Sequence, residues 1–252
     1  MSLPAEWIVP DWPAAANVRA FVTTRAGGVS TGEYGSMNLG LNSGDDPAHV
    51  ERNRAIVRSH LPSAPAWLAQ VHGTEVARVD SLARSPAGAV ETVARADAAI
   101  AALPGHVAVV LTADCMPLFL ADRAGRKVAV AHAGWRGLAA GVVERTLEGM
   151  AIEARDVVAW MGPAIGPTAF EVGAEVKAAF ERADPQASSA FAPHAPGKFM
   201  ADLYALARQR LERRGVREVH GGGFCTYRDD ARFFSYRRVQ KSGRMGAFIW
   251  MD

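Results

Sequence analysis

Apolar residues along the chain fall into short runs typical of buried strands and into longer stretches with helical spacing. The short runs, each bounded by Gly, Pro or charged residues, predict strands over 19–24, 67–71, 107–112, 128–132 and 157–161. Helical spacing and terminal signals, such as Asp45-Asp46-Pro47 at a start and Gly215 at an end, predict helices over 45–60, 135–150, 172–182 and 200–214. Since no linker or repeat divides them, we expect one α+β domain over residues 1–252.

Three segments lack this patterning. Residues 27–44 hold six glycines together with Ser, Thr and Asn, and they predict a long loop of the kind that is often functional. Residues 183–197, rich in Ala, Ser and Pro, predict an exposed insert. The tail over 224–250 predicts strands joined by Arg-rich loops.

Composition narrows the class of protein. With 252 residues, 49% of them hydrophobic and 21% charged, the chain can bury a large core without disulfides. The net charge of only +2 argues against a nucleic-acid partner, and apolar runs such as 107–111 are far too short to span a membrane. Because there are two cysteines and no signal-peptide pattern, we expect a cytoplasmic protein.

Candidate metal ligands lie where strand-like runs end. His72 and His132 each end such a run next to a Gly-containing segment, and Cys115 follows a third run. Two imidazoles and a thiolate can form a zinc site with an open fourth position. The spacings of 43 and 17 residues match no compact zinc motif, so hydrogen-bonded structural histidines and a buried cysteine remain alternatives at this point.

Arginines near these positions are candidates to bind an anion. Arg25 precedes a Gly-rich turn whose amides could face a phosphate, and Arg136 opens a predicted helix directly after His132. Arg54 lies within a predicted helix. A plain turn and a solvated helix face are the structural alternatives for Arg25 and Arg54.

Other polar residues suggest contacts to a substrate. Asn38 could bind a substrate hydroxyl or simply stabilise a turn. Glu171 could act as an acid or base, bind a ribose hydroxyl, or be an ordinary charge at a helix start. For Asp114 we favour orientation of a ligand histidine over acid–base catalysis, and we expect Cys225 to be structural.

The motifs that contain these residues resemble a known family. In order over residues 22–250 they are VTTRAGGVS, SMNLG, ERNRAIV, QVHGTEV, TADCMPLFL, AHAGWRGL, MGPAIGP, FEVG, FCTYRDDARFFSYRR and SGRMGAFIW. Together they resemble the laccase-domain family of bacterial YfiH-like proteins. Its members are named multicopper polyphenol oxidases and are also described as purine nucleoside phosphorylases. TADCMPL and AHAGWRG are the most specific of these motifs, whereas residues 183–197 match none.

The resemblance implies a mixed β-sheet core with flanking helices, and a metal, usually zinc, held by His72, Cys115 and His132. It also implies phosphorolysis of adenosine, inosine and methylthioadenosine with some adenosine deamination, so a nucleoside and phosphate would be the partners. Arg25, Arg54 and Arg136 would then hold phosphate, and Asn38 or Glu171 would bind ribose. A monomer or a small homo-oligomer is compatible with this interpretation.

Three alternative functions remain open. A full laccase copper set is not expected, because the seven histidines include no His-X-His pair, although copper in the His₂Cys site could support polyphenol oxidation. Cys115 could instead be a nucleophile with His72 or His132 as its base, as in an amidase that edits cell-wall peptides. The third alternative is a non-catalytic module that binds a metal or a nucleoside.

Overall fold

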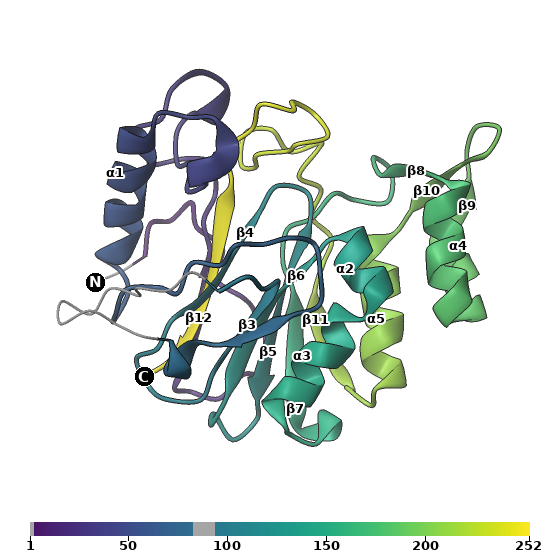
Figure 1. The fold of residues 1–252 in the computed structure, drawn as a ribbon, viewed down its shortest axis with the longest axis horizontal. Coiled ribbons are helices and arrows are strands. Elements are labelled where there is room, and N and C mark those ends of the chain that lie inside the picture. The colour runs from purple at the N-terminus through teal and green to yellow at the C-terminus, as the bar shows by residue number, and fades with distance from the viewer. Residues whose placement is uncertain (1–2, 83–93) are drawn as a thin grey trace.

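The core of the protein is a six-stranded mixed β-sheet (Figure 1). A computed structural model describes residues 3–82 and 94–252. Strands β5 and β6 pair antiparallel at the centre, whereas β2 pairs parallel with β3 and β11 parallel with β7. The strand order is β11 (Glu218–Gly221), β7 (Val157–Met161), β5 (Met116–Asp122), β6 (Val128–Ala133), β3 (Ala98–Ala101) and β2 (Val76–Arg78).

A second, antiparallel sheet packs against one face of this core. Its order is β1 (Val18–Val22), β12 (Met245–Met251) and β4 (Ala108–Thr112). Because side chains alternate between the two faces of a strand, Val110 and Ile249 point into a cluster with Phe119 and Trp160 of the core sheet. Every residue of β12 is buried, so this strand lies inside the molecule.

Helices close the two outer faces. Val57 of α1 (Pro47–Arg58) packs on the outer face of the antiparallel sheet, and the remaining helices lie beyond the core sheet. From left to right, Figure 1 shows α1, the antiparallel sheet, the core sheet and then the remaining helices. The helices beyond the core sheet are α2 (Trp135–Ala140), α3 (Val142–Met150), α4 (Ala174–Ala183) and α5 (Leu203–Arg213). The single α+β domain with a mixed sheet and flanking helices is therefore confirmed.

A small third sheet lies beside the upper end of α4 in Figure 1. Its order is β8 (Glu171–Gly173), β10 (Lys198–Ala201) and β9 (Phe191–Pro193). The helices predicted from residues 172 and 200 therefore begin later, after β8 and β10. The predicted insert over 183–197 is exposed over most of its length, but it also contains a 3₁₀ turn and β9, and its Ala187, Ala190 and Phe191 are buried.

Two further predictions of elements are wrong for identifiable reasons. The helix predicted over 135–150 is broken at Gly141, whose φ of +102° ends α2 and starts α3. The run 67–71 is not a strand: next to it lies a single bridge, Ala66 to Ala108. Instead, the Gln70 side chain donates Nε2–H to the carbonyl of Leu111 and accepts from the Leu111 N–H. These two side-chain hydrogen bonds take the place of backbone pairing between strands.

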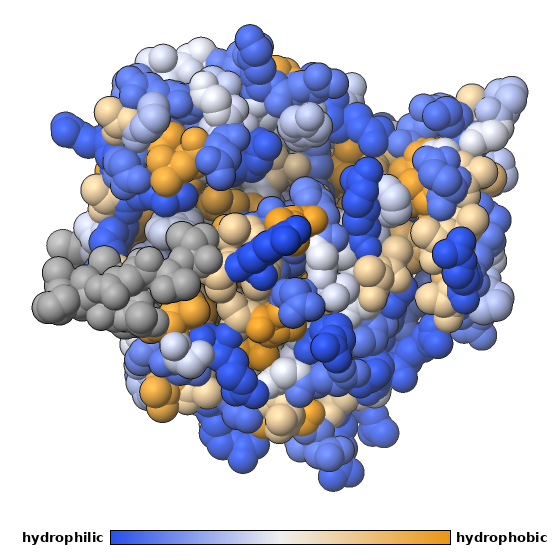
Figure 2. Space-filling view, in the orientation of Figure 1, coloured by the Kyte–Doolittle hydropathy of each residue, from blue (hydrophilic) through white to orange (hydrophobic). Residues whose placement is uncertain are grey.

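Sequence patterning also missed strands. The alanine-rich β3 and the Pro-containing β5 lack strong strand signals, although both are fully buried. In the tail, β12 is the only strand within 224–250, and the Arg-rich stretch before it forms turns. None of the helices in the described ranges is long and apolar enough to cross a membrane, and the visible face in Figure 2 is largely hydrophilic with separate apolar patches.

Candidate metal centre

His72, Cys115 and His132 converge at one end of the core sheet, where β5 begins and β6 ends. Their ligand atoms all lie within 4.8 Å of one another, with 3.8 Å between Cys115 Sγ and His72 Nε2. Ligands about 2.0–2.3 Å from one zinc ion are within about 4 Å of each other, so small side-chain rotations bring all three onto one ion. Two imidazoles and a thiolate fit zinc or copper.

The strand register explains why residues distant in sequence meet. Pro117 lies opposite His132 and Met116 opposite Ala133, so Cys115, directly before β5, comes beside the end of β6. Gly134 makes this approach possible, since a Cβ there would lie 2.6 Å from Cys115 Sγ. The glycine of the AHAGWRG motif is therefore needed for close packing at the thiol.

Asp97, which sequence patterning missed, connects the two histidines. Its buried carboxylate accepts hydrogen bonds from the backbone N–H groups of Val71, His72 and Gly73, at 3.1, 2.9 and 2.7 Å. It also accepts one from His132 Nδ1 at 2.9 Å, which leaves Nε2 of that ring for a metal or a thiol. The signal in the sequence was a single acid at the start of the buried run 98–101.

Electrostatics at this centre favour a thiolate. Burial opposes ionisation of Cys115, but the charges of His132 and His72 and their hydrogen bonds outweigh it and lower its pKa to about 6. Burial likewise opposes charging of His132, but Cys115 and Asp97 raise its pKa to about 9. Without metal the two groups form a thiolate–imidazolium pair, and the thiolate is the form that binds metals.

Backbone conformation marks the same place. His72 has a φ of +60° and Asp114 a φ of +84°, in the left-handed region that residues other than glycine seldom adopt. The Asp114 carboxylate accepts 2.6 Å hydrogen bonds from Thr226 Oγ1 and Arg237 N. It thus anchors the tail beside Cys115, and the orientation of a ligand histidine predicted for Asp114 is instead performed by Asp97.

Comparison with known proteins agrees with the motifs. The sequence profile of the family described as multi-copper polyphenol oxidoreductase laccase matches residues 19–252. This chain belongs to that laccase family. A Pseudomonas aeruginosa protein named purine nucleoside phosphorylase is 52% identical over 98% of each chain. Escherichia coli YfiH, given the same activity in its name, is 50% identical over 97% of this chain and 98% of its own.

Solved structures give the same result. A Neisseria meningitidis protein described as a DUF152 family member superposes with a TM-score of 0.94 at 46% identity, covering 98% of this chain and 99% of its own. YlmD of Geobacillus stearothermophilus superposes with a TM-score of 0.91 at 29% identity, covering 100% and 98%. The fold of the laccase-family chain is therefore shared over its whole length.

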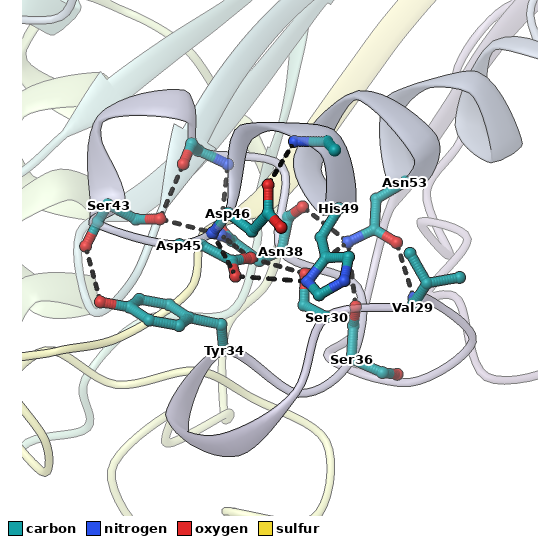
Figure 3. A network of polar contacts seen from close by, with 12 residues as sticks. Val29, Ser30, Tyr34, Ser36, Asn38, Ser43, Asp45, Asp46, His49 and Asn53 are labelled. Carbon is teal, nitrogen blue, oxygen red and sulfur yellow. Dashed lines mark hydrogen bonds and ion pairs between the residues drawn. The ribbon is translucent and has the colours of Figure 1, made fainter.

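In this laccase-family chain, the Gly-rich loop over 27–44 is held by a closed polar network (Figure 3). Buried Asn53 of α1 donates to Ser30 Oγ and to the carbonyls of Ser36 and Asn38, and it accepts from Val29 N. Asn38 donates to Ser43 Oγ and Asp45, and its oxygen accepts from the backbone N–H groups of Gly40 and Arg244. Asn38 keeps no free donor or acceptor for ribose, so its turn-stabilising alternative holds.

Two of the predicted anion-binding arginines also hold this loop. Arg25 donates Nε to the carbonyl of Gly35 and Nη1 to that of Asp230. Arg54 donates Nε to the carbonyl of Leu39 and stacks on Trp67, with 3.9 Å from Cζ to the ring centroid. Burial lowers the pKa of both guanidinium groups. Their Nε donors are thus engaged by the protein.

The remaining predicted residues are exposed or half-buried. Arg136 is exposed and stacks on Trp135 at 4.5 Å. Glu171, at the edge of the small sheet, pairs with His194 at 3.4 Å. Arg237 links Glu171 to the metal centre, because its backbone N–H donates to Asp114 and its Nη1 donates to the Glu171 carbonyl. The Cys225 sulfur accepts a 3.3 Å hydrogen bond from Gly166 N, which agrees with the structural role predicted for it.

Proposed function

We propose that this chain is a zinc-dependent purine nucleoside phosphorylase that acts on adenosine, inosine and methylthioadenosine. The observation that carries the proposal is 52% identity over 98% of both chains to a protein named for that activity. The His72–Cys115–His132 cluster supports it by supplying a metal-binding donor set at an edge where His72 is exposed.

The reaction is a displacement at the anomeric carbon of ribose. A phosphate oxygen forms a bond to C1′, the bond from C1′ to the purine nitrogen breaks, and the base leaves with the electron pair and takes up a proton. The products are the free purine and a sugar 1-phosphate, which is ribose 1-phosphate from adenosine or inosine and 5-methylthioribose 1-phosphate from methylthioadenosine. Adenosine deamination, proposed as a side activity, replaces the amino group by a water oxygen and releases ammonia.

The chain's own residues would prepare this chemistry. His72 and His132 would hold the metal through ring nitrogens and Cys115 through its thiolate, with Asp97 fixing the His132 tautomer. Bound zinc supplies Lewis-acid polarisation of an oxygen atom. Glu171 would bind ribose hydroxyls; its backbone carbonyl is joined through Arg237 to Asp114, and its carboxylate would have to exchange His194 for the ribose.

Metal quantitation and a phosphate requirement test the proposal together. Protein produced without added copper should contain close to one zinc per chain, and release of hypoxanthine from inosine should require phosphate but no oxygen. Any phenol oxidation should track added copper. Oxygen-dependent turnover by zinc-only protein, or hypoxanthine release at the same rate without phosphate, would contradict the assignment.

A second candidate is a hydrolase with Cys115 as nucleophile. It is favoured by one observation, the sequence of thiol, imidazole and carboxylate formed by Cys115, His132 and Asp97, with a Cys115 pKa of about 6. Its substrate would be a peptide amide, as in cell-wall editing. Chelated protein that keeps full activity and loses it on alkylation of Cys115 would favour this candidate over the zinc enzyme.

A further inference from the structure

Most arginines around the metal centre use their side chains to hold backbone carbonyls. Arg25 and Arg54 each donate Nε to a carbonyl of the Gly-rich loop. Arg238 donates Nη1 and Nη2 to carbonyls of the tail, at Thr226, Tyr227 and Phe233. These arginines organise the loop and the tail, and each has at least one edge of its guanidinium engaged by the protein.

Arg244 engages the other side of its guanidinium and leaves Nε free. It is half-buried, and both of its side-chain hydrogen bonds come from Nη1, to the carbonyls of Ser242 and Gly243. Over residues 3–82 and 94–252, neither Nε nor Nη2 has an acceptor, and no carboxylate forms an ion pair with this side chain. The edge formed by Nε and Nη2 is one of the two with which arginine binds carboxylates and phosphates in a bidentate manner.

The position of Arg244 connects this free edge to the metal centre. Its backbone N–H donates to Asn38, and its side chain packs so closely on Gly40 that a Cβ there would lie 2.7 Å from Arg244 Cγ. Its Cζ lies 5.7 Å from the ring centroid of Tyr236, which is half exposed and directly precedes the Asp114-bound Arg237. Arg244 therefore lies where the Gly-rich loop, the tail and the Asp114–Cys115 turn meet.

Burial of a cation without an anionic partner is unfavourable unless a ligand supplies the anion. Burial lowers the pKa of Arg244, although the negative charges of Cys115, Tyr236 and Asp114 act in the opposite direction. A metal at the triad would engage the Cys115 thiolate and leave the free edge of Arg244 for another oxyanion. The closed Asn38–Asn53 network fixes the loop on which the guanidinium rests.

We propose that Arg244 binds phosphate through Nε and Nη2 and places it beside the triad, as the nucleophile of the proposed reaction. This inference rests on the proposed function for the use of the anion, but anion binding itself can be measured independently. It adds to the predicted Arg25, Arg54 and Arg136 a phosphate-binding candidate in the SGRMGAFIW motif, whose Nε is free whereas that of Arg25 and Arg54 is engaged.

The experiment is titration of zinc-loaded protein with inorganic phosphate by calorimetry, without nucleoside, alongside KM measurements for phosphate and inosine. Arg244→Gln should weaken phosphate binding and raise the phosphate KM about 10- to 100-fold, because charge-assisted hydrogen bonds are lost. Arg244→Lys keeps the positive charge but loses the bidentate guanidinium, so its phosphate affinity should lie between those of wild type and Arg244→Gln. Arg52→Gln, an exposed arginine of α1, is the matched control and should match wild type.

Zinc content and the inosine KM should stay within about twofold of wild type in all variants, because Arg244 is not a metal ligand. Equal phosphate affinity in Arg244→Gln and Arg52→Gln would overturn the proposal. It would also be overturned if Arg244→Gln changed the pH dependence of Cys115 alkylation but left phosphate binding unchanged. If Arg244→Gln fails to fold, Arg244→Lys provides the same comparison. Wild-type protein that binds phosphate through Arg244 but cleaves no nucleoside would retain this site and refute the proposed function.

Discussion

This molecule has two polar clusters, the loop network around Asn53 and the metal centre around Cys115. They differ in whether their polar groups find all their partners within the chain. In the loop network, Asn38 and Asn53 use their amide groups on partners within the chain. At the metal centre, the pKa of Cys115 is lowered and two residues have left-handed backbones. Polar groups whose hydrogen bonds are all made within the chain thus build a scaffold, whereas groups with shifted pKa values and strained backbones indicate a site of chemistry.

The largest effect should follow from removing a ligand of the metal centre. His132→Ala and Cys115→Ser should each lose most of the bound zinc, because a ring nitrogen or a soft anionic ligand disappears. We expect kcat/KM for inosine to fall by more than about 100-fold, since even an outer hydrogen bond to a ligand is worth about 10- to 100-fold. Full zinc occupancy by elemental analysis in both variants would refute the ligand assignment.

Asp97→Asn should weaken zinc binding by about 10- to 100-fold, measured by competition with a chromophoric chelator. The carboxylate accepts from four N–H groups, and an isosteric amide offers only one acceptor oxygen. Asp80→Asn is the matched control, because Asp80 also accepts from backbone amides, at Ala102 and Leu103, away from the triad. Equal zinc affinity in the two variants would show that Asp97 has no special role.

The pH dependence of Cys115 alkylation should report its environment. In chelated protein the rate should rise with pH through about 6 and then level off, because the folded-state pKa is about 6. At pH 7 this gives about 30 times more thiolate than a free cysteine has. His132→Ala should move the midpoint upward, and zinc should suppress alkylation. A midpoint near that of free cysteine in the chelated wild type would contradict the thiolate–imidazolium pair.

The loop network should respond in stability and not in metal binding. Asn53→Ala removes four hydrogen bonds from a fully buried side chain, so we expect about 2–4 kcal/mol lower stability by urea denaturation. Zinc affinity measured on the folded fraction should change by less than about threefold, because Asn53 contacts no ligand. A large loss of zinc without loss of stability would mean that the two clusters are not separate.

Strong local signals in the sequence predicted much of the fold. The Asp-Pro start of α1 is observed, with Asp46 accepting from Ala48 N, and the buried strands β6 and β7 follow their apolar runs. Predictions failed where tertiary contacts decide. The alanines of β3 carry little strand propensity, and the run beside Gln70 is held by side-chain hydrogen bonds.

At the candidate site, residue type and position at strand ends were enough to bring His72, Cys115 and His132 together. The roles of the surrounding polar residues could not be predicted, because they depend on which donors and acceptors of Arg25, Asn38, Arg54 and Arg244 the folded chain engages. Asp97 was missed for a related reason. Its four hydrogen-bond partners come from segments about 25 and 35 residues away, and no local pattern announces them.

The left-handed backbone at His72 has a consequence for attempts to make this protein more heat-resistant. Glycine at that position would relieve about 1 kcal/mol of conformational strain while keeping the backbone N–H that Asp97 binds. A library screened for thermal survival in the presence of a chelator should therefore accumulate glycine at residue 72, whereas one screened for turnover should retain histidine. The position at which the two screens diverge would locate the active centre without any knowledge of the substrate.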